Sequence, residues 1–444
     1  MTVQQTIYDA VRRVHGQREV FLEDIIRIGC GYRHFLHLSD AERKRPVRPQ
    51  DLLLKQVSLK TKLMISRYFK ECYGERFTPG YCRVTPGGII TLLDGVLDRT
   101  LVDIQVLSKS EFTTTRAPRR AVLAAATKAV WDDKEDALLV VINRDTQEWC
   151  FWYIYGDLEK HTEPIRHDVD YIDGLVSGDS TPQGMAAEST CRICPYLMGC
   201  PMEPSSDPPM YSADGLTVRV DTTARTALED YLWSLNDKPN DRATKVIHPS
   251  SFSTSKCDRE IAYSLLGTEQ NERVNPKLRR IFDVGHCVHA VLQEAMLDAV
   301  PGFKAEVPVV HEELRISGHC DGQWGKSCAE IKSIGSKGFS SLQKAKSDHE
   351  KQGTTYGVIL EADDVYYIYY NKETGELAVF PVNINRGTWH KLAARASNIV
   401  KTVETDDMPP RLEKDWSCRS CRYAWACKPH LGTTTNSEQK RTFS

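Results

Sequence analysis

The sequence predicts an α/β protein that consists of two homologous domains in tandem. Three observations lead to this prediction. The chain has 444 residues, more than the roughly 100–200 residues of a typical domain. A pattern of four cysteines occurs twice at a constant separation. Around the second cysteine set, segments with strand periodicity and segments with helix periodicity alternate along the chain.

The composition excludes several classes of protein. With 41% hydrophobic and 27% charged residues, the chain can bury a core, which excludes wholesale disorder. Apolar runs such as residues 137–142 are far shorter than the ~20 residues that cross a bilayer. The N-terminus lacks the apolar region of a secretory signal, so we expect a cytoplasmic protein without membrane contacts. The net charge of −2 confines any contact with nucleic acid to a local surface.

The 14 cysteines contain an internal repeat. Two blocks have the form Cys-x2-Cys-x5-Cys, and one further cysteine precedes each block by 161 residues. The first set is Cys30, Cys191, Cys194 and Cys200, and the second is Cys257, Cys418, Cys421 and Cys427. Corresponding members are 227 residues apart. A chance match of this kind is improbable, so we infer a tandem duplication.

The same offset aligns acidic residues and indicates the domain boundaries. Asp321 falls on Asp94, and Glu330 falls on Asp103. We expect a first domain over 1–205, a linker with a helix at 223–236 over 206–245, a second domain over 246–430, and a disordered tail over 431–444.

Two adjacent strands in the second copy carry a candidate metal site. We expect strands over 314–320 and 328–333, with Gly322 and Gly325 at the turn between them. Glu330 and Lys332 then share one face, and the pairing brings Asp321 beside Glu330. Two carboxylates suit Mg²⁺ or Mn²⁺. The alternative is an ordinary surface Glu/Lys pair in a hairpin.

A helix predicted over 277–297 adds a candidate ligand. His289 is in the middle of an apolar stripe, and Gly285 precedes it by one turn. The stripe consists of Leu278, Phe282, Gly285, His289, Leu292 and Met296. Taken alone, His289 is a core histidine; beside a carboxylate pair it is a third metal ligand. His286 and His319 are weaker candidates.

A polar helix predicted over 339–360 places Gln352 and Tyr356 on one face. This pair either supports the lysine or a phosphate, or it belongs to a solvated face with a core tyrosine. The nearby Gly325-Lys326-Ser327 resembles the end of a P-loop, but it enters a strand and lacks the leading glycine. We therefore predict no nucleotide hydrolysis.

The second cysteine set joins the two ends of its domain. Cys257 begins a helix that ends near Leu266, so the C-terminal triplet has to fold back to meet it. Four thiolates suit zinc or a 4Fe–4S cluster. Zinc sites more often pair two Cys-x2-Cys motifs, so the arrangement of one plus three favours the cluster.

Several short motifs occur in a fixed order over residues 246–430. They are Ser253-x-Ser255-x-Cys257, Gly285-x3-His289, Gly318-His-x-Asp321-Gly322, Glu330-x-Lys332, Gln352-x3-Tyr356 and the second cysteine block. This set resembles the RecB-like branch of the PD-(D/E)XK nuclease superfamily. It is most similar to iron–sulfur exonucleases associated with CRISPR adaptation and phage recombination.

The resemblance implies a fold, cofactors and site residues. Each domain would be a mixed central sheet flanked by helices and stapled by a four-cysteine 4Fe–4S cluster. His289, Asp321, Glu330 and the Ile331 carbonyl would bind Mn²⁺ or Mg²⁺, Lys332 would be the catalytic lysine, and Gln352 and Tyr356 would support it. The implied activity is hydrolysis of DNA, with 5′ to 3′ exonuclease action on single strands favoured.

The first copy departs from this pattern. At the 227 offset, His289 becomes Lys62, Lys332 becomes Gln105, and Gln352 and Tyr356 become Ala125 and Ala129. We therefore expect a degenerate nuclease domain that keeps its own cluster on Cys30, Cys191, Cys194 and Cys200.

Three functional classes follow from the sequence. The first is a metal-dependent DNA exonuclease in recombination, repair or CRISPR prespacer processing, in a bacterial or phage-infected cell. The second is a non-catalytic DNA-binding protein, and the third is a zinc-stapled scaffold. Candidate DNA contacts are 43–45, Arg116, 119–120, Arg259, 277–280 and the tyrosines of 367–370. Because no ATPase motif is present, a helicase or a recombination or CRISPR adaptation protein is an expected partner.

Overall fold

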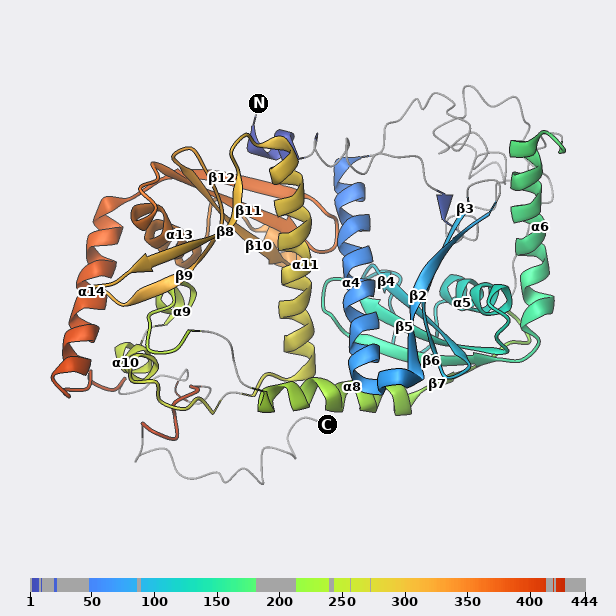
Figure 1. The fold of residues 1–444 in the computed structure, drawn as a ribbon, viewed down its shortest axis with the longest axis horizontal. Helices are drawn as coiled ribbons and strands as arrows, with labels where there is room; N and C mark the ends of the chain where they lie inside the picture. The colour runs from blue at the N-terminus through green and yellow to red at the C-terminus, as the bar shows by residue number, and fades with distance from the viewer. Residues whose placement is uncertain are drawn as a thin grey trace.

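A computed structural model describes residues 2–7, 9, 20–21, 48–85, 89–180, 213–238, 243–255, 257–271, 273–412, 418 and 421–427. Two mixed sheets flanked by helices are formed by these ranges, and they lie side by side in Figure 1. This arrangement is consistent with the two tandem α/β domains that the sequence predicts. No helix in the described ranges is both long enough and apolar enough to span a bilayer.

The first sheet has seven strands within the described residues, in the order β1-β3-β4-β5-β6-β7 with β2 also on β3. The strands are β1 (Val20–Phe21), β2 (Phe77–Val84), β3 (Ile89–Leu97), β4 (Thr100–Leu107), β5 (Asp136–Asn143), β6 (Trp149–Tyr155) and β7 (Thr217–Val220). Strands β4 and β5 are parallel, and α5 (Arg119–Trp131) connects them. This helix covers one face of the sheet, together with α6 (Leu158–Ser177), whereas α4 (Pro49–Tyr73) and α8 (Thr222–Ser234) cover the other.

The second sheet has five strands in the described residues, in the order β12-β11-β10-β9-β8. The strands are β8 (Lys304–His311), β9 (Ile316–Trp324), β10 (Ser327–Ile334), β11 (Asp364–Asn371) and β12 (Leu377–Asn383). Strands β10 and β11 are parallel and are joined through α12 (Ser336–Ser340) and α13 (Ser347–Ile359). The remaining helices are α9 (Pro249–Thr254), α10 (Asp258–Leu266), α11 (Pro276–Ala299) and α14 (Arg386–Glu404). The sheet lies between α11 on one face and α13 on the other.

The duplication is visible in the element bounds. Strands β8, β9 and β10 begin and end 227 residues after β2, β3 and β4, respectively. The pairs α4/α11, α5/α13, β5/β11, β6/β12 and α6/α14 recur within one residue of that offset. The cysteine spacing therefore identified the correct internal repeat.

The segment 206–245 differs from the expected linker. Strand β7 pairs with β6 and extends the first sheet. The predicted helix exists as α8, but its Leu228 and Leu232 are fully buried in the core that α4 forms with this sheet. Conversely, residues 3–7 near the N-terminus are helical, and Ile7 is buried in the core of the second sheet. Each sheet is thus completed by chain from outside its expected domain.

Two predicted helices differ in detail. The segment 339–360 is not one helix, because the chain breaks between α12 and α13, where the Lys346 N–H donates to the Tyr369 hydroxyl. Helix α11 begins as expected, with Asn275 capping the Leu278 N–H and Pro276 in the first turn. Its buried face, however, is centred on Val284 and Val288, and Phe282 is 50% exposed.

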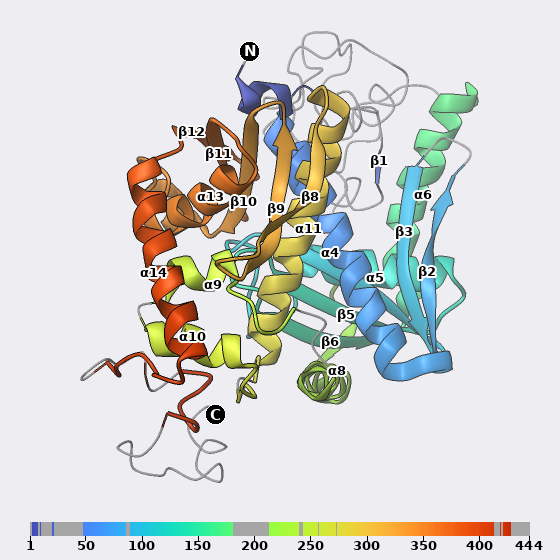
Figure 2. The same ribbon diagram turned by 60° about the vertical axis from the view of Figure 1, so that its left-hand side comes forward.

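The buried face of α11 is explained by the contact between the two units. Helix α11 packs against α4, its counterpart in the repeat, and Figures 1 and 2 show the two helices side by side. The Lys60 Nζ is 2.7 Å from Glu294 Oε1, and the Tyr68 hydroxyl donates to Asp283. Related elements therefore meet, as they would in an internal dimer.

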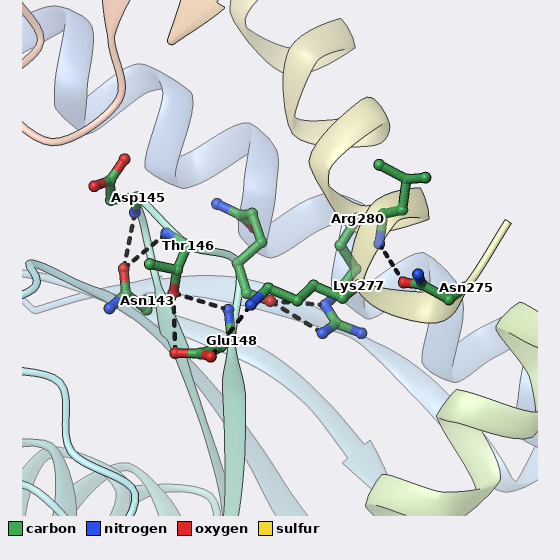
Figure 3. A network of polar contacts seen from close by, with 9 residues as sticks. Asn143, Asp145, Thr146, Glu148, Asn275, Lys277 and Arg280 are labelled. Carbon is green, nitrogen blue, oxygen red and sulfur yellow. Dashed lines mark hydrogen bonds and ion pairs between the residues drawn. The ribbon is translucent and has the colours of Figure 1, made fainter. Parts of the chain in front are cut away.

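A second part of this contact joins α11 to the β5–β6 turn. Arg280 donates to the Gln147 carbonyl at 3.0 and 3.1 Å, and its guanidinium lies 3.7 Å from the centre of the Trp149 ring. Figure 3 shows Lys277 reaching Glu148 beside it, at 3.2 Å. Arg280 is buried in this contact, so the suggestion that it contacts DNA is wrong.

Candidate active site

The two predicted carboxylates meet where β9 and β10 separate. Gly322 pairs with Ala329, and the next pair in that register would be Asp321 with Glu330. There the Ile331 N–H donates to Asp321 Oδ2 at 2.6 Å instead of to a β9 carbonyl. Asp321 lies inside β9, which continues past Gly322 to Trp324, so the turn is shorter than predicted and centres on Gly325 and Lys326. The separation of the strands turns one backbone N–H into an anchor for the carboxylate.

Glu330 is the most strongly buried acidic group of this site. Its side chain is 1% exposed, and neither carboxylate oxygen has a well-directed hydrogen bond among the described residues. The Lys332 ammonium, two residues further on β10, forms an ion pair with Oε1. Burial, and then the charge of Asp321, raise the pKa of Glu330 to about 7. A buried carboxylate without a hydrogen bond is costly unless a cation accompanies it.

His289 approaches Asp321 from α11. Its Nδ1 lies 3.4 Å from Asp321 Oδ1. Burial acts to lower the pKa of His289, but the hydrogen bond and charge of Asp321 outweigh it and raise the pKa. Likewise, burial acts to lower the pKa of Lys332, but Glu330 and Asp321 raise it. Without a metal, both groups are therefore held as cations by the carboxylates.

Glu306 is a further acidic residue at this site that the sequence did not indicate. It stands opposite Asp321 in the β8–β9 pair, between the pairs Ala305–Gly322 and Val307–Cys320. His289, Glu306 and Asp321 each offer a ligand atom within 4.8 Å of the others. The Glu306 backbone has a φ of 50°, a conformation that is costly for a residue with a side chain.

Gln293 links these ligands. It lies one turn after His289 on α11, and its Nε2 donates to Glu306 Oε1 at 2.6 Å and to the Asp321 carbonyl at 2.9 Å. A spacing of four residues after a candidate histidine was the only signal for it in the sequence. Gln293 is buried, so it holds two candidate ligands in place without facing solvent.

The donor set fits a hard divalent cation. One imidazole nitrogen and carboxylate oxygens from three strands converge, and the Glu330 carboxylate lacks a hydrogen bond. Such ligands suit Mg²⁺ or Mn²⁺. His286 carries an exposed side chain beside Asp283, and His319 lies on β9; neither belongs to this group of ligand atoms.

Gln352 and Tyr356 lie beneath the site on α13. Both are buried, and the Gln352 Nε2 donates to the Tyr356 hydroxyl at 3.2 Å. The solvated face weighed for this helix is thus wrong for these two residues. The charge of Glu330 contributes to the raised pKa of Tyr356 after burial, which places the tyrosine near the carboxylate.

His349 and Tyr369 form a second polar pair near Lys332. Tyr369 pairs with Lys332 in the β10–β11 register, and His349 Nδ1 lies 2.8 Å from the Tyr369 hydroxyl. Burial, and then the charge of Lys332, lower the pKa of His349 to about 4. Tyr367, Tyr369 and Tyr370 are all fully buried, so base stacking on them, which the sequence left open, is wrong.

The second cysteine set is gathered at α10. The residue before this helix is Cys257, and the Tyr263 hydroxyl on α10 donates to the Ala426 carbonyl at 3.2 Å. Tyr423 is buried against Tyr263, with ring centres 5.6 Å apart. Burial raises the thiol pKa of Cys257 and of Cys421, and neighbouring thiols of this set add to both shifts. The C-terminal triplet therefore returns to the start of α10, as predicted, although no three of the four sulfur atoms come within 4.8 Å of one another.

Some predicted residues lie outside the described part of the chain. These are Cys30, Cys191, Cys194, Cys200 and the basic run 43–45. Of the other candidate DNA contacts, Arg116, Arg119 and Arg120 are exposed and Arg259 is half-buried.

Comparisons with known proteins found similarity to solved structures only. No family model and no curated protein matches the chain. The crystal structure of SSO0001 is 17% identical, with a TM-score of 0.32 over 47% of this chain and 98% of that one. An alkaline exonuclease, LHK-Exo from Laribacter hongkongensis, is 12% identical, with a TM-score of 0.31 over 40% of this chain and 94% of that one. The structure of LHK-Exo in complex with dAMP gives 14% identity and a TM-score of 0.30 over 37% and 90%.

Proposed function

We propose that the protein is a divalent-metal-dependent DNA nuclease whose active site lies at the opening between β9 and β10. The observation that carries the proposal is the buried Glu330 carboxylate, which lacks a hydrogen bond and lies beside Lys332 and Asp321. A charged group held in this way is a candidate functional site. The polarity, 5′ to 3′ on single strands, comes from the family resemblance of the motifs.

The proposed ligands of the cation are His289, Asp321, Glu330, the Ile331 carbonyl and Glu306. Bound Mg²⁺ or Mn²⁺ would supply an activated water and neutralise charge on the phosphate. The Ile331 N–H keeps Asp321 oriented, and Gln293 keeps Glu306 oriented. The Lys332 ammonium would then be free to turn from Glu330 to the phosphate oxygens and stabilise their developing charge. Gln352 and Tyr356 would support β10 from below.

A nuclease assay tests this proposal. DNA labelled at the 5′ or the 3′ end, single- or double-stranded, is incubated with Mn²⁺, Mg²⁺ or EDTA. We expect cleavage with either metal, none with EDTA, and loss of cleavage in Lys332→Ala and Glu330→Gln. Lys326→Ala, an exposed lysine in the same hairpin, is the matched control. Cleavage that survives both active-site substitutions would refute the site, and DNA binding without cleavage would favour the non-catalytic alternative.

The two cysteine sets are proposed to hold 4Fe–4S clusters, one on Cys257, Cys418, Cys421 and Cys427 and one on Cys30, Cys191, Cys194 and Cys200. Support comes from the repeat and from the return of the C-terminal triplet to α10. An anaerobically purified sample should be brown. We expect Cys421→Ser to lower its iron content and Cys82→Ser, an exposed thiol outside the sets, to leave it unchanged. Bound zinc in place of iron would overturn the proposal.

The pathway and partners are also part of the proposal. Recombination, repair or CRISPR prespacer processing would each supply DNA ends, and a helicase would supply single strands. Copurification with such proteins, compared between wild type and Glu330→Gln, tests this point separately from catalysis.

A further inference from the structure

The first sheet contains a second buried cluster of charged groups that the proposed chemistry does not use. Asp94 on β3 and Asp103 on β4 occupy the positions of Asp321 and Glu330 in the repeat. Asp94 Oδ2 accepts the Ile104 N–H at 2.8 Å, as Asp321 Oδ2 accepts the Ile331 N–H. The strand opening that forms the metal site in the second sheet is therefore present in the first sheet too.

Lysine ammonium groups fill this opening. Lys62 stands where His289 stands in the repeat, and its Nζ lies 3.3 Å from Asp94 Oδ2. Lys128, on α5, is fully buried, and its Nζ lies 2.7 Å from Asp103 Oδ1. The position of Lys128 corresponds to Thr355 in the second copy. Two carboxylates thus face two ammonium groups, whose positive charge equals that of one divalent cation.

Hydrogen bonding separates the two sites further. Asp103 accepts from Lys128 on one oxygen and from the Gln105 Nε2, at 2.7 Å, on the other. Glu330, at the corresponding position, has no well-directed hydrogen bond on either oxygen. Asp94 feels the charges of both lysines. A metal ion entering the first site would have to displace ammonium groups that already satisfy the carboxylates.

We propose that Lys62 and Lys128 are a permanent internal substitute for the divalent cation, so that the first sheet is held together without metal and closed to it. The chain then has one divalent-metal site, in the second sheet. The lysines take over the charge neutralisation that the second copy leaves to the metal. This proposal concerns the first sheet alone and does not depend on nuclease activity.

Manganese binding to the full chain tests the proposal. Mn²⁺ stoichiometry is measured by electron paramagnetic resonance for wild type, Asp94→Asn and the double variant Lys62→His/Lys128→Thr. We expect Asp94→Asn to bind as much Mn²⁺ as wild type. The double variant, which carries the residues of the second copy, should bind one Mn²⁺ more. A loss of Mn²⁺ in Asp94→Asn, or no gain in a folded double variant, would overturn the proposal.

A thermal unfolding measurement decides the matter if the double variant fails to fold. Lys128→Met alone leaves Asp103 buried without its cation, so the melting temperature should fall. Lys128→Met combined with Asp103→Asn removes both charges and keeps an acceptor for Gln105, so it should recover most of the loss. No recovery would mean that the two charges are not coupled and would refute the substitution of metal by lysine. Wild-type protein that binds no Mn²⁺ would instead contradict the proposed function and leave this comparison intact.

Discussion

The Lys332 ammonium and the Glu330 carboxylate form an ion pair on one face of β10. The two residues are separated by Ile331, so the alternation of a strand is sufficient to place them together. In the absence of metal, Lys332 is the nearest cation to a carboxylate that is otherwise unsatisfied. A lysine and a metal would therefore share one acidic group, and their roles can be separated by substitution.

Lys332→Ala should remove cleavage but retain metal. Loss of a charge-stabilising donor typically lowers kcat by roughly 100- to 1000-fold, whereas the proposed metal ligands remain in place. Glu330→Gln should lose both cleavage and Mn²⁺ affinity. Initial rates on end-labelled DNA and Mn²⁺ titrations on the same samples measure the two effects. If Lys332→Ala lost Mn²⁺ as completely as Glu330→Gln, the lysine would have only a structural role.

The metal-free protein should become less stable as the pH rises from about 4.5 to about 7. The folded protein holds Glu330 with a pKa of about 7, above its usual 4.5. In this window the native state binds a proton that the unfolded chain has released, so the free energy of unfolding falls with rising pH. The raised pKa of His289 acts in the same direction. Urea unfolding in EDTA at several pH values measures the trend.

Glu330→Gln and added metal are the controls for this trend. A glutamine imitates the protonated acid, so the variant should show a weaker pH dependence. Mn²⁺ should stabilise the wild type more at pH 8 than at pH 5.5, because its ligands have to lose their protons. An unfolding free energy in EDTA that increased over the same window would contradict the burial of Glu330.

Gln293→Leu should weaken Mn²⁺ binding although Gln293 is not a proposed ligand. It donates to both Glu306 and Asp321, and loss of such orienting groups typically costs 10- to 100-fold in metal affinity, as an order-of-magnitude guide. Mn²⁺ titration of the variant measures the loss. Glu313→Gln, in the exposed β8–β9 turn, is the control. An affinity equal to that of wild type would show that Glu306 is not held at the site by Gln293.

The sequence was sufficient for features that depend on local order or on the repeat. The 227-residue offset recurs in the strand bounds, and strand alternation placed Glu330 beside Lys332. Glu306 and Lys128 could not be predicted in this way. Each reaches its site through pairing or packing between elements distant in sequence: Glu306 through the β8–β9 register, and Lys128 through the packing of α5 on β4.

The contact between the two units also escaped the sequence. Helical periodicity gave α11 one buried face, which included Phe282. The helix instead packs against both its own sheet and α4, so the buried face turns toward Val284 and Val288. A single periodic stripe cannot represent a helix with two neighbours.

Arg280→Lys should destabilise the contact between the units almost as much as Arg280→Ala. Arg280 donates from two nitrogens to the Gln147 carbonyl and lies over Trp149. A lysine keeps the charge but cannot reproduce the planar fork or the stacking. Hydrogen bonds from charged groups contribute about 1.5–3 kcal/mol each, so a measurable loss is expected in both variants. Burial lowers the pKa of Arg280 to about 10, which shows that the contact bears a desolvation cost. Differential scanning calorimetry should show earlier unfolding, and separate transitions if the two units uncouple, whereas Arg279→Lys, one residue earlier on α11, should melt like wild type. Full stability in Arg280→Lys would mean that charge alone, and not the geometry of the guanidinium, holds α11 to the β5–β6 turn.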